Sequence, residues 1–346
     1  MATVGAVLVT CAPGARHAAW AGPLDRACVD RSAHWVVHVN TEALAASEVG
    51  RTLLADREGP VARASARIEA LFGLRVDRDV LGMTSYGVGS GGTVTVLDTT
   101  SKAGDLGEHL THAGVLDLKA ATEGGVAFLS WVLRGEMTYA AVRPGQERGR
   151  NRVVLCESKE ALLRACAVMN APQGEAAWPR PLNAEPKAAS FVFAAVGRAA
   201  GTENEIAEDR LGLAAGTTPV AGSPFATEAM VFRAAEELVL DVGQADLGHP
   251  EDSGDLYLSL NLRAENEEVA QDCEAVIRGM FASVALQARE KTELAPAATL
   301  ARSVRVEREG PHLWLKTEPK VEVVVQFLNG LRTQREAVAS EVGEGS

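Results

Sequence analysis

The feature that most constrains this chain is a proline-rich segment at residues 171–189, which separates two long stretches of ordinary globular sequence. The segment holds four prolines and has no hydrophobic periodicity, as is typical of a linker between domains. The chain has 346 residues, 47% of them hydrophobic, whereas a single hydrophobic core stops growing near about 250 residues. We therefore predict two domains, at residues 31–170 and 190–336, followed by a disordered tail at 337–346.

The first stretch begins with a short run rich in β-branched and aromatic residues, His34–Asn40, which indicates a buried strand. Further on, Gly89, Gly91 and Gly92 separate two strand patterns and supply the positive backbone φ angles that a hairpin turn needs. Strands are expected near 34–40, 79–88, 93–97, 126–133, 137–142 and 153–157, and helices near 42–54, 61–72, 102–113 and after Ser158.

The second stretch contains the clearest alternation in the sequence. In Asp255–Arg263, leucine occupies every second position from Leu256 to Leu262, so this strand should bury one face only. Asn266 then caps a long amphipathic pattern, which we expect to lie as a helix across a sheet. That helix is expected at 267–289, strands at 191–196, 229–234, 237–242, 303–308 and 312–316, and a final helix after Thr317.

The two stretches share one order of elements, namely strand, helix, antiparallel strands, helix. The fold class predicted from this order is α+β, with two similar halves, each an antiparallel sheet with helices packed on one face. A divergent internal duplication is inferred from the element order alone.

Charge and hydropathy exclude several classes of partner. The formal net charge is -12 and the isoelectric point is near 5.2, so the chain as a whole repels nucleic acid and anionic lipid. The densest basic stretch, Arg143–Arg152, lies between apolar runs and is predicted to be a solvated hairpin loop. Because the net charge is negative, we expect no nucleic-acid partner. No apolar run approaches the ~20 residues of a membrane helix, so we expect no transmembrane span.

The sequence motifs favour no enzyme class. A glycine string, Gly87–Gly92, runs into the strand pattern at Thr93, whereas a phosphate-binding loop must run into a helix. A nucleophile elbow, a zinc-protease helix and a P-loop are all missing from the sequence. We therefore assign no catalytic residue, no cofactor-binding residue and no cofactor. The strand tryptophans Trp35, Trp131 and Trp314 are expected to pack in the core.

The weak candidates for a metal site are His109 and His112, which lie three residues apart on a predicted helix and could bind one ion together. Because no third ligand is near in the sequence, a polar helix face is the favoured explanation of the pair. His34 and His38 share a strand face but would stand about 13 Å apart, too far to bind one metal. The five cysteines show no CxxC spacing, so buried thiols are expected rather than a zinc ribbon.

The first residues allow two interpretations. Val4–Thr10 is apolar but short and no basic residue precedes it, so residues 1–30 are either a truncated export signal or a simple first strand or tail. Cys11 follows a loose lipoprotein-like box and is a candidate for lipidation under the first interpretation. The protein is then expected outside the cytoplasm, in the periplasm or envelope, and in the cytoplasm if the N-terminus is complete as given.

The run His34–Leu44 resembles the opening of uncharacterised exported α+β proteins of planctomycete-type bacteria. The similarity returns at Glu237–Val242, at the helix pattern from Glu267 and at Val304–Gly310. The resemblance implies export of the protein, and it transfers no catalytic residue.

These observations lead to three hypotheses about function. The favoured one is a non-catalytic exported or envelope-associated protein that binds an unknown protein or small ligand. The first alternative is a hydrolytic enzyme, metal-dependent in one form, with a site assembled from dispersed carboxylates and histidines. The second alternative is a self-associating structural protein.

Overall fold

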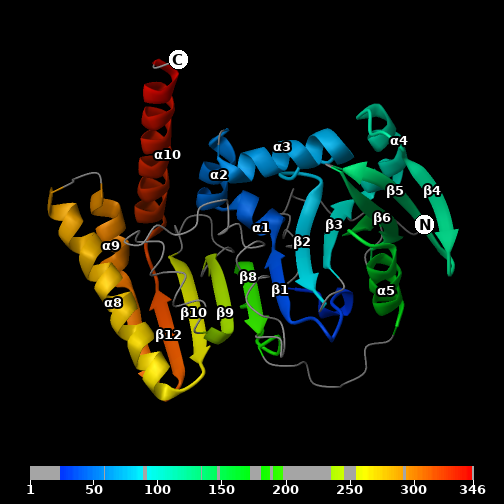
Figure 1. The fold of residues 1–346 in the computed structure, drawn as a ribbon. Helices are drawn as coiled ribbons and strands as arrows, with labels where there is room; N and C mark the ends of the chain where they lie inside the picture. Colours follow the sequence, from blue (N-terminus) through cyan, green and yellow to red (C-terminus); the bar gives the residue numbers. More distant parts are fainter. Residues whose placement is uncertain are drawn as a thin grey trace, which may run out of the picture.

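The computed structural model describes residues 24–57, 59–88, 92–133, 135–145, 149–171, 181–187, 190–197, 235–244, 255–290 and 294–344. Within them the chain is a mixed α+β protein built on one antiparallel sheet of twelve strands, in the order β11-β12-β10-β9-β8-β1-β2-β3-β7-β6-β5-β4 (Figure 1). The predicted class, α+β with antiparallel strands, is confirmed.

Most of the predicted elements are present, but β4 and α9 were not predicted, and the single helix expected at 42–54 is divided into α1 and α2. The strands are β1 (Trp35–Val39), β2 (Val80–Gly87), β3 (Thr93–Thr100), β4 (Lys119–Glu123), β5 (Val126–Leu133), β6 (Glu136–Pro144), β7 (Arg150–Cys156), β8 (Ser190–Gly197), β9 (Ala235–Gln244), β10 (Leu256–Ala264), β11 (Arg305–Glu309) and β12 (His312–Thr317). The helices are η1 (Arg26–Cys28), α1 (Thr41–Ala46), α2 (Glu48–Ala55), α3 (Pro60–Phe72), η3 (Ser101–Asp105), α4 (Leu106–His112), α5 (Lys159–Asn170), α8 (Glu267–Glu290), α9 (Ala295–Ser303) and α10 (Val321–Glu344). The strand expected at 229–234 lies outside the described residues.

The two stretches of sequence meet inside the sheet, where β1 pairs with β8. The pairing runs from Trp35 opposite Val196 to Val39 opposite Val192. The structure therefore does not form two separate sheets on either side of residues 171–189. Both strands carry apolar side chains on both faces, and such strands are best buried in the interior of a sheet, with a neighbour on each side.

Helices cover both faces of the first half of the sheet, rather than one face as expected. On one face, here called the α5 face, η1 and α5 share a hydrophobic cluster with Val96 and Val154. On the opposite face, α3 and α4 share another cluster with Leu97 and Val153. Because neighbouring residues of a strand point to opposite sides, strands that are apolar at every position need a cover on each side.

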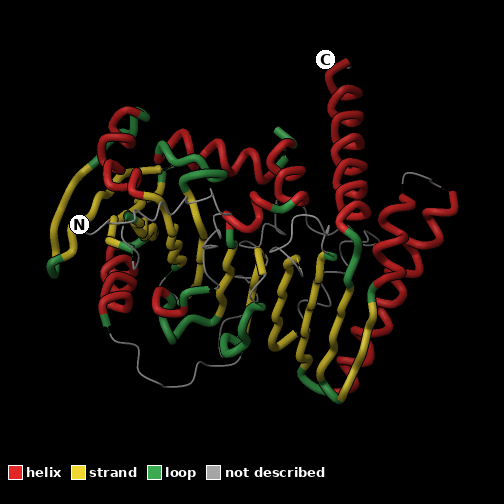
Figure 2. The backbone as a smooth tube through the Cα atoms, turned by 180° about the vertical axis from the view of Figure 1, so that it is seen from behind, coloured by secondary structure: helices red, strands yellow, loops and turns green. Residues whose placement is uncertain are grey.

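In the second half, α8 covers the face opposite the α5 face, as the predicted amphipathic stripe requires. Ala270, Cys273 and Ile277 of α8 share a cluster with Leu262 of β10 and Leu313 of β12. The pairing registers place these leucines on the same side of the sheet as Leu97. On the α5 face of these strands, no helix of the described residues lies against the sheet (Figure 2).

A further cluster closes one end of the sheet. Ala43 of α1, Val49 of α2 and Val321 of α10 pack together with Phe191 and Leu256. Beyond this contact α10 extends away from the sheet (Figure 1). None of the helices within the described ranges is both long and apolar enough to cross a membrane.

The segment before β1 belongs to the core of the first half. Cys28 and Val29 are buried on the α5 face in the same cluster as Phe193 of β8. Leu182, from the expected linker, is part of that cluster too. The expected boundary at residue 31 thus falls within a packed segment, and residues 1–23 lie outside the described part of the chain.

Candidate functional site

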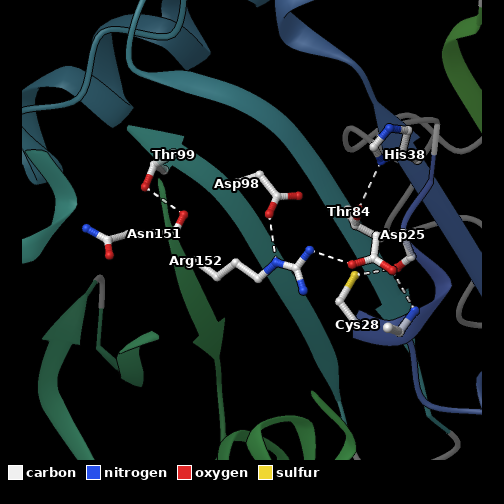
Figure 3. A network of polar contacts seen from close by, with 9 residues as sticks. Asp25, Cys28, His38, Thr84, Asp98, Thr99, Asn151 and Arg152 are labelled. Carbon is white, nitrogen blue, oxygen red and sulfur yellow. Dashed lines mark hydrogen bonds and ion pairs between the residues drawn. The ribbon is translucent and has the colours of Figure 1, made fainter. Parts of the chain in front are cut away.

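A buried cluster of polar side chains lies between the segment before β1 and the α5 face of the sheet (Figure 3). At its centre, Nε of Arg152 donates to Oδ1 of Asp98 at 2.8 Å, and Nη2 donates to Oδ2 of Asp25 at 2.5 Å. Asp98 of β3 is the residue opposite Arg152 of β7 in the sheet, whereas Asp25 comes from the cap of η1. Together with three neighbours these residues form what we call the Arg152 cluster: Asp25, Cys28, His38, Thr84, Asp98 and Arg152.

Arg152 carries a permanent charge in this cluster. Its residue is only 9% exposed. Burial alone lowers the pKa of Arg152, but the carboxylates of Asp98 and Asp25 outweigh it and raise that pKa above its usual value. Two charge-assisted contacts on one buried guanidinium fix the position of η1 relative to β3 and β7.

The other half of the cluster has the residue types of a nucleophile and its base. Nδ1 of His38 lies 2.9 Å from Oγ1 of Thr84, which also contacts the Cys28 thiol. Burial raises the pKa of Cys28 to about 12, and burial lowers the pKa of His38 to about 4. The thiol therefore stays protonated and the imidazole neutral near pH 7, while the reactive species of a cysteine is the thiolate.

Access also argues against chemistry in the Arg152 cluster. Cys28 is fully buried, Thr84 is 1% exposed and His38 is 4% exposed. Cys28 donates to the backbone oxygen of Asp25 at 2.9 Å, a contact inside its own turn. The arrangement therefore serves to hold the segment before β1 on the sheet.

A second ion pair fastens the same segment to α5. Nε of Arg164 donates to Oδ2 of Asp30 at 2.5 Å, and both the backbone N–H and the hydroxyl of Ser32 donate to Asp30 Oδ1. Burial raises the pKa of Asp30, but these hydrogen bonds outweigh it and hold that pKa below its usual value. The charged form of Asp30 is thus the one that the fold stabilises.

The two histidines singled out as metal ligands lie in the last turn of α4. His109 is half-buried and His112 is exposed. The ring of His109 packs against Gly73, where an added Cβ would come within 2.6 Å of its Nδ1. In the part of the chain that the structure describes, no group of three or more His, Cys, Asp or Glu side chains could hold a metal ion.

The basic stretch Arg143–Arg152 forms the predicted hairpin between β6 and β7, but the prediction that it is solvated is wrong for Arg152. Its position directly before the apolar run Val153–Leu155 was the one available signal, since a strand residue next to such a run can point into the core. The glycine string Gly87–Gly92 also joins two antiparallel strands, as predicted.

The second candidate region is the α5 face of β11 and β12 together with the Arg263 end of β10 and the Glu237 end of β9, which we call the open sheet face. Toward the other end of β9 and β10 the same side of the sheet is covered, since Tyr257 is buried and Nζ of Lys187 lies 4.1 Å from its ring centroid. Along β12, burial alternates: Leu313, Leu315 and Thr317 are buried, whereas the residues between them are half-buried or exposed. The same alternation holds on β11, where Val306 is buried and its neighbours are exposed. Six polar or aromatic residues define the open sheet face: Glu237, Asn261, Arg263, His312, Trp314 and Lys316.

Aromatic and cationic groups meet at the end of the open sheet face that lies next to the β11–β12 turn. The rings of His312 and Trp314 stack with centroids 5.7 Å apart and an interplanar angle of 18°. Arg263 stands opposite His312 in the sheet, and its Nη2 binds Glu236 at 3.0 Å and Glu237 at 2.8 Å. Trp314 thus lies on the open side of the sheet rather than in the core, while Trp131 is fully buried as predicted.

Comparison with known proteins gives little that bears on this chain. No protein-family model matches it, and no curated protein matches it. A solved structure of a Treponema protein, titled "Structure of crystal form I of TP0453", is similar over 90% of this chain and 98% of that chain, with a TM-score of 0.42 and 12% sequence identity.

Proposed function

We propose that this chain is a non-catalytic, exported or envelope-associated binding protein, and that it docks a partner protein on the open sheet face. The observation that carries the proposal is the stacked pair of His312 and Trp314, held outside the core on strands whose other side packs under α8. An aromatic pair on a rigid sheet is a preorganised contact surface, since the backbone is already ordered before a partner arrives.

The composition of the face favours a protein over a small ligand. Tryptophan and arginine carry most of the energy in protein–protein interfaces, and here Trp314 and Arg263 lie on neighbouring strands. Exposed charges surround them on β11 and β12, including Lys316 and Glu307, as in the polar rim of an interface. Small-molecule sites, in contrast, are concave and mostly apolar.

The Arg152 cluster supports a non-catalytic role. It is the part of the described chain where a thiol, an imidazole and carboxylates come together, and burial keeps its thiol protonated. The envelope location rests on the resemblance of His34–Leu44 to exported proteins.

The proposal is tested by photo-crosslinking in cells that make the protein. Asn261 of β10 is the partner of Trp314 on the adjacent strand and lies on the same face of the sheet. A photoreactive residue in place of Asn261 should give one discrete adduct in the envelope fraction. The substitution Trp314→Ala in the same chain should reduce that adduct at least several-fold, because it removes the aromatic contact.

The matched control carries the photoreactive residue in place of Gln271, which is exposed on α8. This position should give no discrete adduct. Equal labelling at both positions, an adduct insensitive to Trp314→Ala, or a strictly cytoplasmic pool of the protein would each count against the proposal.

A further inference from the structure

The last strand of the sheet, β4, is an exposed edge. It pairs with β5 from Lys119 opposite Ser130 to Glu123 opposite Val126, and β4 ends the strand order of the sheet. All five of its residues are exposed. An edge strand presents backbone N–H and C=O groups on its outer side, which can pair with a strand of another chain.

The edge is held in a fixed shape. A two-residue turn, Gly124 and Gly125, with φ of 58° and 78°, joins β4 to β5, and positive φ at both positions is the signature of the tight hairpin turn that matches sheet twist. Nζ of Lys159 on α5 binds Oε2 of Glu123 at 2.9 Å. The strand is therefore ordered before it meets a partner.

The sequence of β4, Lys-Ala-Ala-Thr-Glu, is complementary to itself when two copies run antiparallel. A two-fold axis at Ala121 places Lys119 of one copy opposite Glu123 of the other, twice, and Ala121 opposite Ala121 at the centre. Opposite charges directly across a strand pair are stabilising, whereas like charges are destabilising. We propose that β4 binds the β4 strand of a second copy of this chain, which joins the two sheets into one.

Exposed apolar residues near this edge agree with the proposal. Leu116, three residues before β4, is 79% exposed, and Val132 and Met137 at the near end of β5 and β6 are 42% and 40% exposed. In the two-fold pairing, the chain before Lys119 runs beside the Gly124–Gly125 turn of the second copy. Leu116 then loses exposure to water on association.

The opposite edge of the sheet is a poorer partner for itself. An antiparallel pair of β11 strands centred on Glu307 also sets Arg305 opposite Glu309 twice, but it brings the Glu307 carboxylate against its own copy, a like-charge contact that the β4 pair avoids because Ala121 is at its centre. Pairing of β4 with β11 is the alternative that the charges permit, and it would build an open series of copies rather than a closed dimer.

Charge reversal tests the proposal in the full chain. Lys119→Glu and Glu123→Lys each replace two attractive contacts with two repulsive ones, so each variant alone should be monomeric. Mixed together they restore opposite charges at both contacts and should form a heterodimer. A five-residue strand pair buries little surface, so the native dimer is expected in the weak, transient class below about 1,200 Å², and sedimentation velocity should cover concentrations up to several hundred micromolar.

The control is Arg305→Glu on β11, which leaves the β4 pairing untouched and should dimerise like the native chain. Circular dichroism checks that each variant is folded. A native chain that stays monomeric throughout overturns the proposal, as does a mixture of Lys119→Glu and Glu123→Lys that does not associate. Species larger than a dimer that Arg305→Glu abolishes overturn it in favour of the β4–β11 contact.

Discussion

At the scale of single residues, the feature with the largest energetic consequence is the guanidinium of Arg152. It neutralises two carboxylates from segments far apart in sequence, Asp25 and Asp98. Removing the shared partner of such a group leaves partly buried charges without compensation. Ion pairs on the surface, in contrast, contribute little to the free energy of unfolding.

We predict that Arg152→Met lowers the free energy of unfolding by about 3 kcal/mol, because the two partly buried carboxylates then lose the cation that neutralises both of them. Urea denaturation measures the change. The matched control is Arg143→Met on the neighbouring strand, whose contact with Asn170 is exposed, and it should leave the midpoint nearly unchanged. Equal effects of the two substitutions would contradict a special role for the Arg152 cluster.

His38 makes stability depend on pH. Burial lowers its pKa from 6.5 to about 4, so the unfolded chain binds the proton more readily than the folded one. The free energy of unfolding is therefore highest above pH 6.5, where His38 is neutral in both states. It decreases as the pH falls from 6.5 toward 4, because only the unfolded chain binds the proton in this interval.

The expected loss from His38 between about pH 7.5 and about pH 5 is roughly 2 kcal/mol. The variant His38→Asn keeps a polar group near Thr84 but cannot titrate, so its stability should fall less over the same interval. Denaturation at both pH values, for both proteins, gives the comparison. An identical pH dependence of the two proteins would show that His38 is not the titrating group.

At the scale of elements, two glycines with open space around them differ in backbone conformation: one lies in a turn with positive φ and the other lies inside a helix. Gly125 in the β4–β5 turn has a φ of 78°, and no described side chain comes within 4 Å of an added Cβ. Gly279 in α8 has the same free space but lies within a helix.

We predict opposite signs for alanine at these two positions. Gly125→Ala should lower the free energy of unfolding by about 1–2 kcal/mol, because a side chain is strained in the left-handed region. Gly279→Ala should raise it by about 0.5–1 kcal/mol, because glycine weakens a helix interior. Thermal denaturation of the two variants tests both signs, and a stabilising Gly125→Ala would mean that the turn is not held as described.

Much of the element order was accessible from sequence. The alternation in β10, the helix pattern of α8 and the hairpins around Gly92 and Gly310 all appear where periodicity and turn residues place them. Strand β4 was missed, since Lys119–Glu123 is exposed throughout and carries no hydrophobic alternation. Hydrophobic periodicity arises from burial of one face of an element, so it cannot predict a strand whose residues are all exposed.

The contacts between elements that are distant in the chain could not be predicted from the sequence. The pairing of β1 with β8 depends on which of several apolar strands meet, and each of them has the same local pattern. The Arg152 cluster was missed for a related reason: its two aspartates lie 54 and 127 residues away from the arginine. A charge in sequence does not reveal whether a distant partner will allow it to be buried.

At the scale of the whole molecule, the joined sheet couples the two halves. Phe193 and Ala195 of β8 lie in the same hydrophobic cluster as Val36 of β1 and Val154 of β7. Neither half buries these side chains alone.

We therefore predict one calorimetric unfolding transition for the full chain, with equal calorimetric and van't Hoff enthalpies. Phe193→Ala should lower the free energy of unfolding by about 3–5 kcal/mol and shift the single transition without splitting it. Two resolved transitions, of which the substitution moves only one, would mean that the halves unfold independently.

The β1–β8 junction also sets the order of events during synthesis. Val39 and its partner Val192 are roughly 150 residues apart, and at about 5–20 residues per second the ribosome needs on the order of ten to thirty seconds to make the intervening chain. Even after β2 has paired with β1, the other edge of β1 stays unpaired throughout that interval, and an apolar strand with an open edge is the kind of surface that recruits neighbouring chains into aggregates. Chaperone capture of the emerging chain is therefore most valuable before β8 leaves the exit tunnel.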